Sequence, residues 1–193
     1  MATLRVTAGT LRGRRIPVPP RDVRPTSERA RQAFFNIIAD RITGARFLDL
    51  FSGSGVFSFE ALSRGAASAI AIDSSRRNIE TINRLAKEYG VVVATITSDV
   101  LKAIPRLGDQ KFDIVYADPP YDYAQYDQLI TALDGKADFV AIEHRKGTSP
   151  FAVETKSLQL IRRAEYGEVW ITLFENPSVI LSREDGEGPP DSE

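Results

Sequence analysis

The pattern of hydrophobic and polar residues changes at residue 46. From there to residue 143, short apolar runs alternate with stretches in which apolar residues recur at helical spacing. The runs that predict strands are 46–50, 68–73, 91–97, 112–117 and 139–143, and the stretches that predict helices are 56–64, 74–88, 99–106 and 124–134. Near-continuous apolar strands separated by helices are typical of a parallel sheet that is covered on both faces.

Two more apolar runs, 158–164 and 168–174, follow the fifth strand and are separated only by a short turn around Gly167. Because no helix fits between them, they predict an antiparallel hairpin. The expected fold class is therefore α/β, with a Rossmann-like sheet of five parallel strands that is closed by a C-terminal antiparallel hairpin.

The N-terminal part of the chain has a different pattern. Residues 2–20 alternate between apolar and polar residues and are broken at Gly9 and Gly13, which predicts a hairpin or small ribbon. A helix is predicted from residue 25 onward, with Thr26 or Ser27 as its N-cap. Its expected buried face consists of Ala30, Ala33, Phe34, Ile37 and Ile38.

Composition adds limits to this picture. The chain has 193 residues, of which 42% are hydrophobic, so it can bury one good core and is of single-domain size. It has no cysteine, which excludes disulfides, iron–sulfur clusters and thiolate zinc sites. No apolar stretch approaches the roughly 18 residues of a membrane span, and the N-terminus lacks the apolar segment of a signal peptide. We therefore expect a cytoplasmic protein.

Charge is unevenly distributed along the chain. Residues 1–46 carry ten arginines against three acidic residues, a net charge of +7, and the tail from Arg183 onward carries one arginine against five acidic residues. An arginine-rich segment on an acidic body is typical of a surface that binds a nucleic-acid backbone, although a solvated basic surface has the same composition. Within this segment, Arg29 and Arg31 can point away from the buried face of the predicted helix.

The chain accordingly divides into three regions. We expect a basic N-terminal extension over 1–45, a main domain over 46–182 and an acidic tail over 183–193 that is disordered. In the main domain, the single histidine, His144, is expected at a charged surface, and Trp170 in the core.

The segment D49-L-F-S-G-S-G55 ends the first strand of the main domain and opens a helix. Ligands of doubly wound sheets bind at the carboxyl ends of strands, where Gly53 and Gly55 would let the backbone approach a ligand and supply amides. A dinucleotide fingerprint needs a third glycine, but that position is Ser58. S-adenosylmethionine (SAM) has no pyrophosphate, and its methionine ammonium would suit Asp49. A plain strand–helix turn is the alternative interpretation.

Acidic residues also end the next two strands. Asp73 comes 20 residues after Gly53, where a carboxylate would accept hydrogen bonds from the ribose hydroxyls of a nucleotide. Asp99 follows the third strand and could accept one from an adenine amino group. Each aspartate could instead be a helix N-cap, but three acids at three successive strand ends favour a ligand site.

The fourth strand ends in A117-D-P-P-Y-D122. Because neither proline has a backbone N–H, this segment offers hydrogen-bond acceptors only, the Asp118 carboxylate and the Pro119 carbonyl. These complement an exocyclic amino group of a nucleobase, and holding both of its hydrogens would turn the nitrogen lone pair toward a sulfonium methyl group. Tyr121 offers a face on which the base can stack. A simple stop between strand and loop is the alternative.

These motifs carry a resemblance to a known family. D118-P-P-Y121 resembles the [DNS]-PP-[YFW] motif of amino-group methyltransferases, and D49-L-F-S-G-S-G55 resembles their SAM motif. Together with R5-V-T-A-G-T-L-R-G-R-R-I-P-V-P, R24-P-T-S-E-R-A-R-Q-A-F-F-N36 and E60-A-L-S-R-G-A66, they make residues 3–176 similar to the RsmD family. Its members are bacterial class I SAM-dependent methyltransferases that modify the N2 amino group of a specific guanine in 16S rRNA.

The resemblance implies a cofactor, a partner and a set of site residues. The cofactor is SAM, and the partner is 16S rRNA in the small ribosomal subunit or its assembly intermediate, with neither a metal nor a membrane; we expect a monomer. The implied cofactor residues are Asp49, Gly53, Ser54, Gly55, Asp73 and Asp99, and the implied residues at the target amine are Asp118, Pro119 and Tyr121. The candidates for RNA binding are Arg12, Arg14, Arg15, Arg24, Thr26 and Arg29.

Three other functions compete with this one. DNA adenine-N6 and cytosine-N4 methyltransferases share the DPPY motif, but they usually need a target-recognition region for which residues 46–176 leave little room. An NAD-dependent oxidoreductase would use a similar sheet, but Ser58 and the DPPY segment argue against it. A non-catalytic RNA-binding or ribosome-assembly factor would not need the acceptor site.

Overall fold

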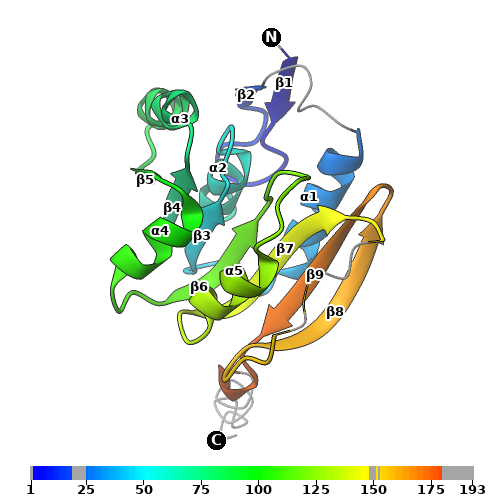
Figure 1. Ribbon diagram of the computed structural model, residues 1–193. Coiled ribbons are helices and arrows are strands. Elements are labelled where there is room, and N and C mark those ends of the chain that lie inside the picture. The colour runs from blue at the N-terminus through cyan, green and yellow to red at the C-terminus, as the bar shows by residue number, and fades with distance from the viewer. Residues whose placement is uncertain (1, 19–24, 148–150, 152, 180–193) are drawn as a thin grey trace, which may run out of the picture.

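The computed structural model describes residues 2–18, 25–147, 151 and 153–179. Two strands, β1 (Ala2–Arg5) and β2 (Arg15–Val18), pair as an antiparallel ribbon outside the main sheet, as the sequence predicts. They are followed by helix α1 (Pro25–Ile37). Figure 1 shows the ribbon next to α2 and above α1, away from the C-terminal strands.

Strands and helices then alternate as expected. The strands are β3 (Arg46–Leu50), β4 (Ser68–Asp73), β5 (Ala94–Thr97), β6 (Phe112–Ala117), β7 (Ala137–Arg145), β8 (Gln159–Tyr166) and β9 (Val169–Glu175). The helices are α2 (Val56–Ser63), α3 (Arg76–Tyr89), α4 (Val100–Ala103) with the 3₁₀ turn η2 (Ile104–Leu107), and α5 (Tyr126–Leu133).

The seven strands form one sheet in the order β5-β4-β3-β6-β7-β9-β8. The first five are parallel, and β9 and β8 run antiparallel at the end of the sheet. This confirms the predicted fold class of five parallel strands closed by a C-terminal hairpin. The chain reverses its winding direction between β3 and β6, so a crevice is expected outside the carboxyl ends of these two strands.

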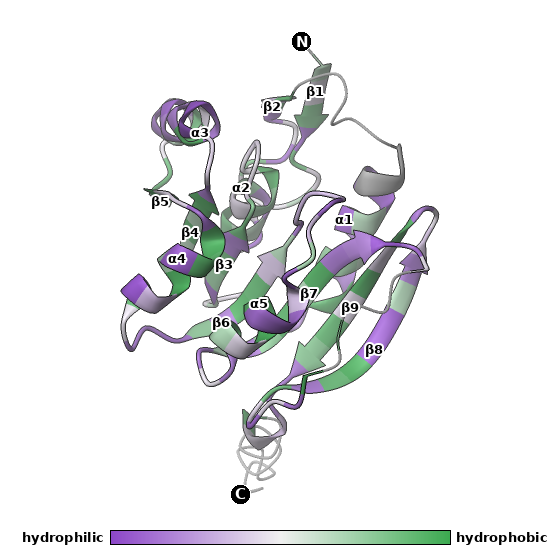
Figure 2. Cartoon of the chain, in the orientation of Figure 1, coloured by the Kyte–Doolittle hydropathy of each residue, from purple (hydrophilic) through white to green (hydrophobic). Residues whose placement is uncertain are grey.

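The core has one hydrophobic layer on each face of the sheet. On one face, Phe34 of α1, Phe59 of α2 and Ile82 of α3 pack in the same cluster as Phe47 and Tyr116. On the other face, α4, η2 and α5 cover a second cluster. Figure 2 shows hydrophobic residues along the central strands and hydrophilic residues over much of α3. Among the described residues, no helix is both long and apolar enough to cross a membrane.

Helix α1 differs in two ways from the prediction. It begins at Pro25, so Thr26 and Ser27 belong to its first turn, and neither is the N-cap. Its fully buried face includes Phe35, which the prediction left out, and Arg31, which the prediction wrongly pointed away from this face. The reason is that residues 31, 34, 35 and 38 fall in one stripe at helical spacing, and this stripe faces the sheet.

Two predictions about the C-terminal strands were wrong. His144 is buried, not exposed, because β7 continues past residue 143 and pairs with β9; its Nε2 lies 2.7 Å from Oγ1 of Thr172. Trp170 is only half-buried, since it lies in the edge hairpin of β8 and β9, where the Arg163 guanidinium lies over its ring. The acidic tail over 183–193 lies outside the described residues.

Candidate active site

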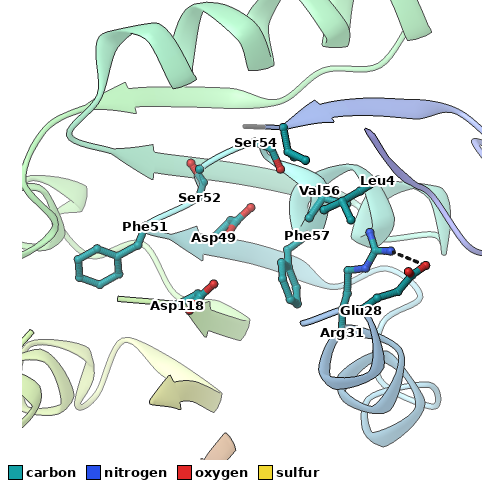
Figure 3. Close-up of a pocket in the computed structure, with 12 residues that line it drawn as sticks. Leu4, Glu28, Arg31, Asp49, Phe51, Ser52, Ser54, Val56, Phe57 and Asp118 are labelled. Carbon is teal, nitrogen blue, oxygen red and sulfur yellow. Dashed lines mark ion pairs between the residues drawn. The ribbon is translucent and has the colours of Figure 1, made fainter. Parts of the chain in front are cut away.

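The carboxyl ends of β3 and β6 border a pocket of about 170 Å³. Three parts of the chain line it: the segment from the end of β3 through the following turn to the start of α2 (Asp49, Phe51 to Ser54, Val56 and Phe57), Asp118 after β6, and the N-terminal extension (Leu4, Val18, Glu28 and Arg31). Figure 3 shows Asp49 and Asp118 on one side of this pocket and the Arg31–Glu28 pair on the other. The structure therefore brings together the two acidic motifs that the sequence singled out.

Asp49 is the most deeply buried acid of the pocket, with only 1% of the residue exposed. Its Oδ2 accepts hydrogen bonds from the backbone N–H of Ser58 at 3.0 Å and from the Ser58 hydroxyl at 2.6 Å. Burial raises the pKa of Asp49 to about 7, because these two bonds only partly offset the loss of water around the carboxylate. Ser58, which breaks the dinucleotide fingerprint, thus has a structural role in holding this carboxylate.

The glycine turn is tightly bonded within the chain. The N–H of Gly53 donates to Oδ2 of Asp73 at 2.7 Å, and the N–H of Gly55 donates to the Ser52 carbonyl at 2.7 Å. Gly55 has a φ of 75°, and a Cβ there would lie 2.7 Å from Cγ1 of Ile82. These glycines therefore shape the turn and let α3 approach it, and their amides are already used.

Asp73 ties the ends of β3 and β4 together. Besides Gly53, it accepts hydrogen bonds through Oδ1 from the Ser75 N–H at 2.7 Å and from Nδ2 of Asn78 at 3.2 Å. The N-cap of α3 is Ser75, so Asp73 does not have that role. Since a carboxylate has about four acceptor positions, Asp73 keeps room for one further donor.

Asp99 is exposed and caps helix α4, with Oδ1 accepting from the Lys102 N–H at 3.1 Å. It also affects Tyr123, whose hydroxyl is buried without a hydrogen-bond partner among the described residues. Burial, and secondly the charge of Asp99, raise the pKa of Tyr123 to about 12. The Tyr123 ring meets the ring of Phe51, which lines the pocket, edge-on at 5.2 Å.

The segment after β6 leads from the end of the strand into a turn. Asp118 is exposed and lines the pocket, and its backbone N–H reaches the Leu50 carbonyl at 3.4 Å, next to the turn after β3. The turn is closed by the Tyr123 N–H, which donates to the Pro120 carbonyl at 2.9 Å and not to that of Pro119. Tyr121 is 51% exposed.

The N-terminal ribbon is fastened to helix α2. The buried Glu60 carboxylate accepts from the Thr7 N–H at 2.8 Å and pairs with Nε of Arg64 at 2.8 Å. The Ser63 hydroxyl accepts from the Leu11 N–H at 2.8 Å. Gly9 lies so close that a Cβ would fall 1.6 Å from the Ser63 carbonyl oxygen. Helix α2 begins directly after Gly55 of the glycine turn, so these contacts with α2 connect the N-terminal extension to that turn.

The candidates for RNA binding are mostly at the surface. Arg12, Arg14, Arg15 and Arg29 are exposed, and the Arg14 guanidinium lies 5.3 Å from the centre of the Tyr89 ring. Arg24 lies outside the described residues, and the side chain of Thr26 is not among those described.

Sequence reasoning missed several pocket residues, notably Arg31, Phe57 and Ser52. Phe57 stacks on Tyr116 with 3.8 Å between ring centres, which makes a flat aromatic wall. The Ser52 hydroxyl and Nη1 of Arg31 are buried and have no hydrogen-bond partner among the described residues. For Arg31 the signal was present, since it lies three, four and seven residues before the buried residues of its stripe.

These side chains fit SAM. The cofactor is a cation with an amino-acid end, and the pocket combines three acidic residues, one arginine and an unpartnered hydroxyl. In the described part of the chain, no group of three or more His, Cys, Asp or Glu side chains is placed to hold a metal ion.

Of the four strand-end acids, Asp49 and Asp118 line the pocket, and Asp73 and Asp99 do not. The sheet order and this pair of acids around one pocket are those of a class I SAM-dependent methyltransferase. Residues 4–175 match the family described as conserved hypothetical protein 95. Ribosomal RNA small subunit methyltransferase D of Escherichia coli K12 is 35% identical over 133 residues, 68% of this chain and 67% of that protein. The chain therefore belongs to the RsmD family.

Two further comparisons agree with this assignment. The protein of the same name from Buchnera aphidicola subsp. Acyrthosiphon pisum is 30% identical over 153 residues, 75% of this chain and 79% of that protein. The solved structure of yhhF from Escherichia coli superimposes with a TM-score of 0.79 and 27% identity, over 91% of this chain and 98% of that one.

Proposed function

We propose that this protein transfers a methyl group from SAM to the exocyclic N2 amino group of one guanine in 16S rRNA. The observation that carries the proposal is that Asp118, at the start of the DPPY segment, faces the same pocket as Asp49 and the glycine turn. An acceptor for an amino group and a turn suited to SAM are thereby held side by side on two adjacent, rigid strands.

The cofactor would be held along the carboxyl edge of the sheet. The Asp49 carboxylate suits the methionine ammonium, and the remaining acceptor position of Asp73 suits one ribose hydroxyl. Asp99 would accept a hydrogen bond from the adenine amino group. Gly53, Ser54 and Gly55 shape the wall against which the cofactor lies. When bound, SAM supplies an electrophilic sulfonium methyl group.

The DPPY segment would hold and polarise the target. The Asp118 carboxylate and the Pro119 carbonyl each accept one hydrogen of the amino group, which directs its lone pair toward the cofactor side of the pocket. The nitrogen becomes positively charged during transfer, and the adjacent Asp118 carboxylate stabilises that charge until a proton leaves to the solvent. Tyr121 stacks on the base, which must be unpaired or flipped to reach this position.

The substrate assignment rests on the relatives and on charge. The relatives named above are ribosomal RNA small subunit methyltransferases, and five described arginines of the extension are exposed, Arg5, Arg12, Arg14, Arg15 and Arg29. Exposed arginines on a ribbon and helix suit the phosphate backbone of a folded RNA. We propose that residues 1–45 form this contact surface. We further propose that the protein, of 21.3 kDa, acts as a monomer.

Labelled methyl transfer to three acceptors, compared side by side, tests this function. The acceptors are deproteinised 16S rRNA, small ribosomal subunits from a strain lacking the enzyme, and duplex DNA. We expect transfer to rRNA or to the subunit, no transfer to DNA, and no transfer to any of them by D118A. Strong transfer to DNA alone would refute the rRNA assignment, and binding of RNA without transfer would indicate an assembly factor.

A further inference from the structure

Arg31 is the unusual charged residue of the pocket. It comes from α1, it is only 2% exposed, and it lines the pocket together with Asp49 and Asp118. Among the described residues that line this pocket, it is the one basic residue. A fully buried arginine is uncommon unless its donors are paired.

The Arg31 guanidinium is only partly paired. Its Nη2 donates to the Arg5 carbonyl at 3.0 Å and lies 3.8 Å from Oε1 of Glu28, a long contact to a side chain that is 48% exposed. Its Nη1 is buried and has no hydrogen-bond partner among the described residues. Since buried polar groups in native proteins are almost always hydrogen-bonded, an unpartnered guanidinium nitrogen beside a pocket indicates an absent anionic ligand.

We propose that Arg31 binds the α-carboxylate of the methionine end of SAM. The guanidinium fork matches a carboxylate in shape and charge, and Asp49, in the same pocket, suits the ammonium of the same amino acid. Arg31 would thus pair with the negative carboxylate, and Asp49 with the positive ammonium, of the same amino-acid group. This inference rests on the proposed position of the methionine end at Asp49, and it is independent of which nucleic acid is methylated.

An RNA phosphate is the competing anion, and the burial of Arg31 argues against it. The arginines that suit a phosphate backbone, such as Arg12, Arg15 and Arg29, are exposed. Arg31 is buried instead, and it lines the pocket together with the turn after β3 and with Leu4 and Val18 of the ribbon. A small anion that enters with the cofactor reaches this position more readily than a backbone phosphate does.

Binding of the α-carboxylate by Arg31 would give the N-terminal extension a second role. Three features place this extension at the cofactor: the ribbon is fastened to α2 through Glu60 and Ser63, its Arg5 carbonyl orients the guanidinium, and α1 carries Arg31. The extension would therefore complete the cofactor site besides presenting arginines to RNA.

Calorimetric binding of two ligands without RNA tests the proposal. The ligands are S-adenosylhomocysteine (SAH), which keeps the amino acid, and decarboxylated SAH, which lacks only the α-carboxylate. We expect R31Q to bind SAH at least about tenfold more weakly than wild type, as for loss of a charge-assisted pair, and to bind decarboxylated SAH with less than about a twofold change. R84Q removes an exposed arginine that does not line the pocket and is the matched control, which should change neither affinity.

Two results would overturn the proposal. An equal loss for both ligands would mean that Arg31 only supports the fold, and an unchanged SAH affinity with weaker, less salt-dependent RNA binding would mean that it contacts phosphate. If R31Q does not fold, wild type itself decides, because it must bind SAH at least about tenfold more tightly than decarboxylated SAH. Equal wild-type affinities would refute the carboxylate contact. Failure of rRNA methylation would leave these binding results unaffected.

Discussion

The buried carboxylate of Asp49 makes folding stability depend on pH. Burial raises its pKa from 3.8 to about 7, so between these two values the folded protein holds a proton that the unfolded chain has released. The free energy of unfolding therefore falls as the pH rises from 3.8 to about 7, and it stays at the lower value above pH 7. The total decrease is about 1.4 kcal/mol for each unit by which the two pKa values differ. A difference of about 3 units gives a cost of about 4 kcal/mol for the ionised group.

Asp49→Asn removes this cost, because the amide stays neutral and its oxygen can still accept from Ser58. Without cofactor, we expect the variant to be more stable than wild type by about 2 kcal/mol at pH 5, rising to about 4 kcal/mol at pH 8. Urea unfolding followed by the fluorescence of Trp170 measures this difference. Asp109→Asn, the same change at an exposed position, should give a profile parallel to that of wild type.

The same group should make SAH binding depend on pH. If the ammonium of SAH needs the ionised carboxylate, the affinity of wild type should rise about tenfold from pH 6 to pH 8, as the ionised fraction rises through a pKa of about 7. The Asp49→Asn variant should bind weakly at every pH. Parallel unfolding profiles for this variant and wild type, together with a flat SAH affinity, would refute the reasoning about Asp49.

Three further predictions concern other parts of the site. Asp118→Ala should abolish methyl transfer and leave SAH affinity within about twofold in calorimetry; collapse of SAH binding would mean that Asp118 belongs to the cofactor site. Charge reversal at Arg24 and Arg29 should weaken RNA binding and lower the slope of log affinity against log salt by about one to two, and an unchanged slope would count against the extension as an RNA surface. Gly9→Ala should lower SAH affinity and thermal stability together, because its Cβ would displace the ribbon from the Ser63 carbonyl; a wild-type melting temperature would contradict this coupling.

Much of the fold could be predicted from the sequence, because each strand is a short apolar run that can be recognised from neighbouring residues alone. The hairpin after residue 158 followed from the length of the turn alone. The boundaries of β7 and the burial of His144 could not be predicted, since they depend on pairing with β9, which is more than twenty residues away. Long-range pairing of this kind overrides what a charged local context suggests.

The site shows the same division. Asp49 and Asp118 were found because strand ends of a parallel sheet meet at one edge. The engagement of the Gly53 amide by Asp73 could not be predicted, because it depends on the register between β3 and β4. The burial of Arg31 was missed for a different reason. We expected a charged side chain to be exposed, although Arg31 lies at helical spacing from the buried residues Phe34, Phe35 and Ile38.

Nucleoside mass spectrometry of 16S rRNA after reaction with the purified protein and SAM tests the central claim most directly. The account predicts that digestion yields N2-methylguanosine, at one nucleotide per rRNA molecule, and that none forms with D118A. Methylated adenosine, methylation of guanine at another atom, or an unchanged product with D118A would contradict the assignment of the Asp118 segment as the site that holds the N2 amino group.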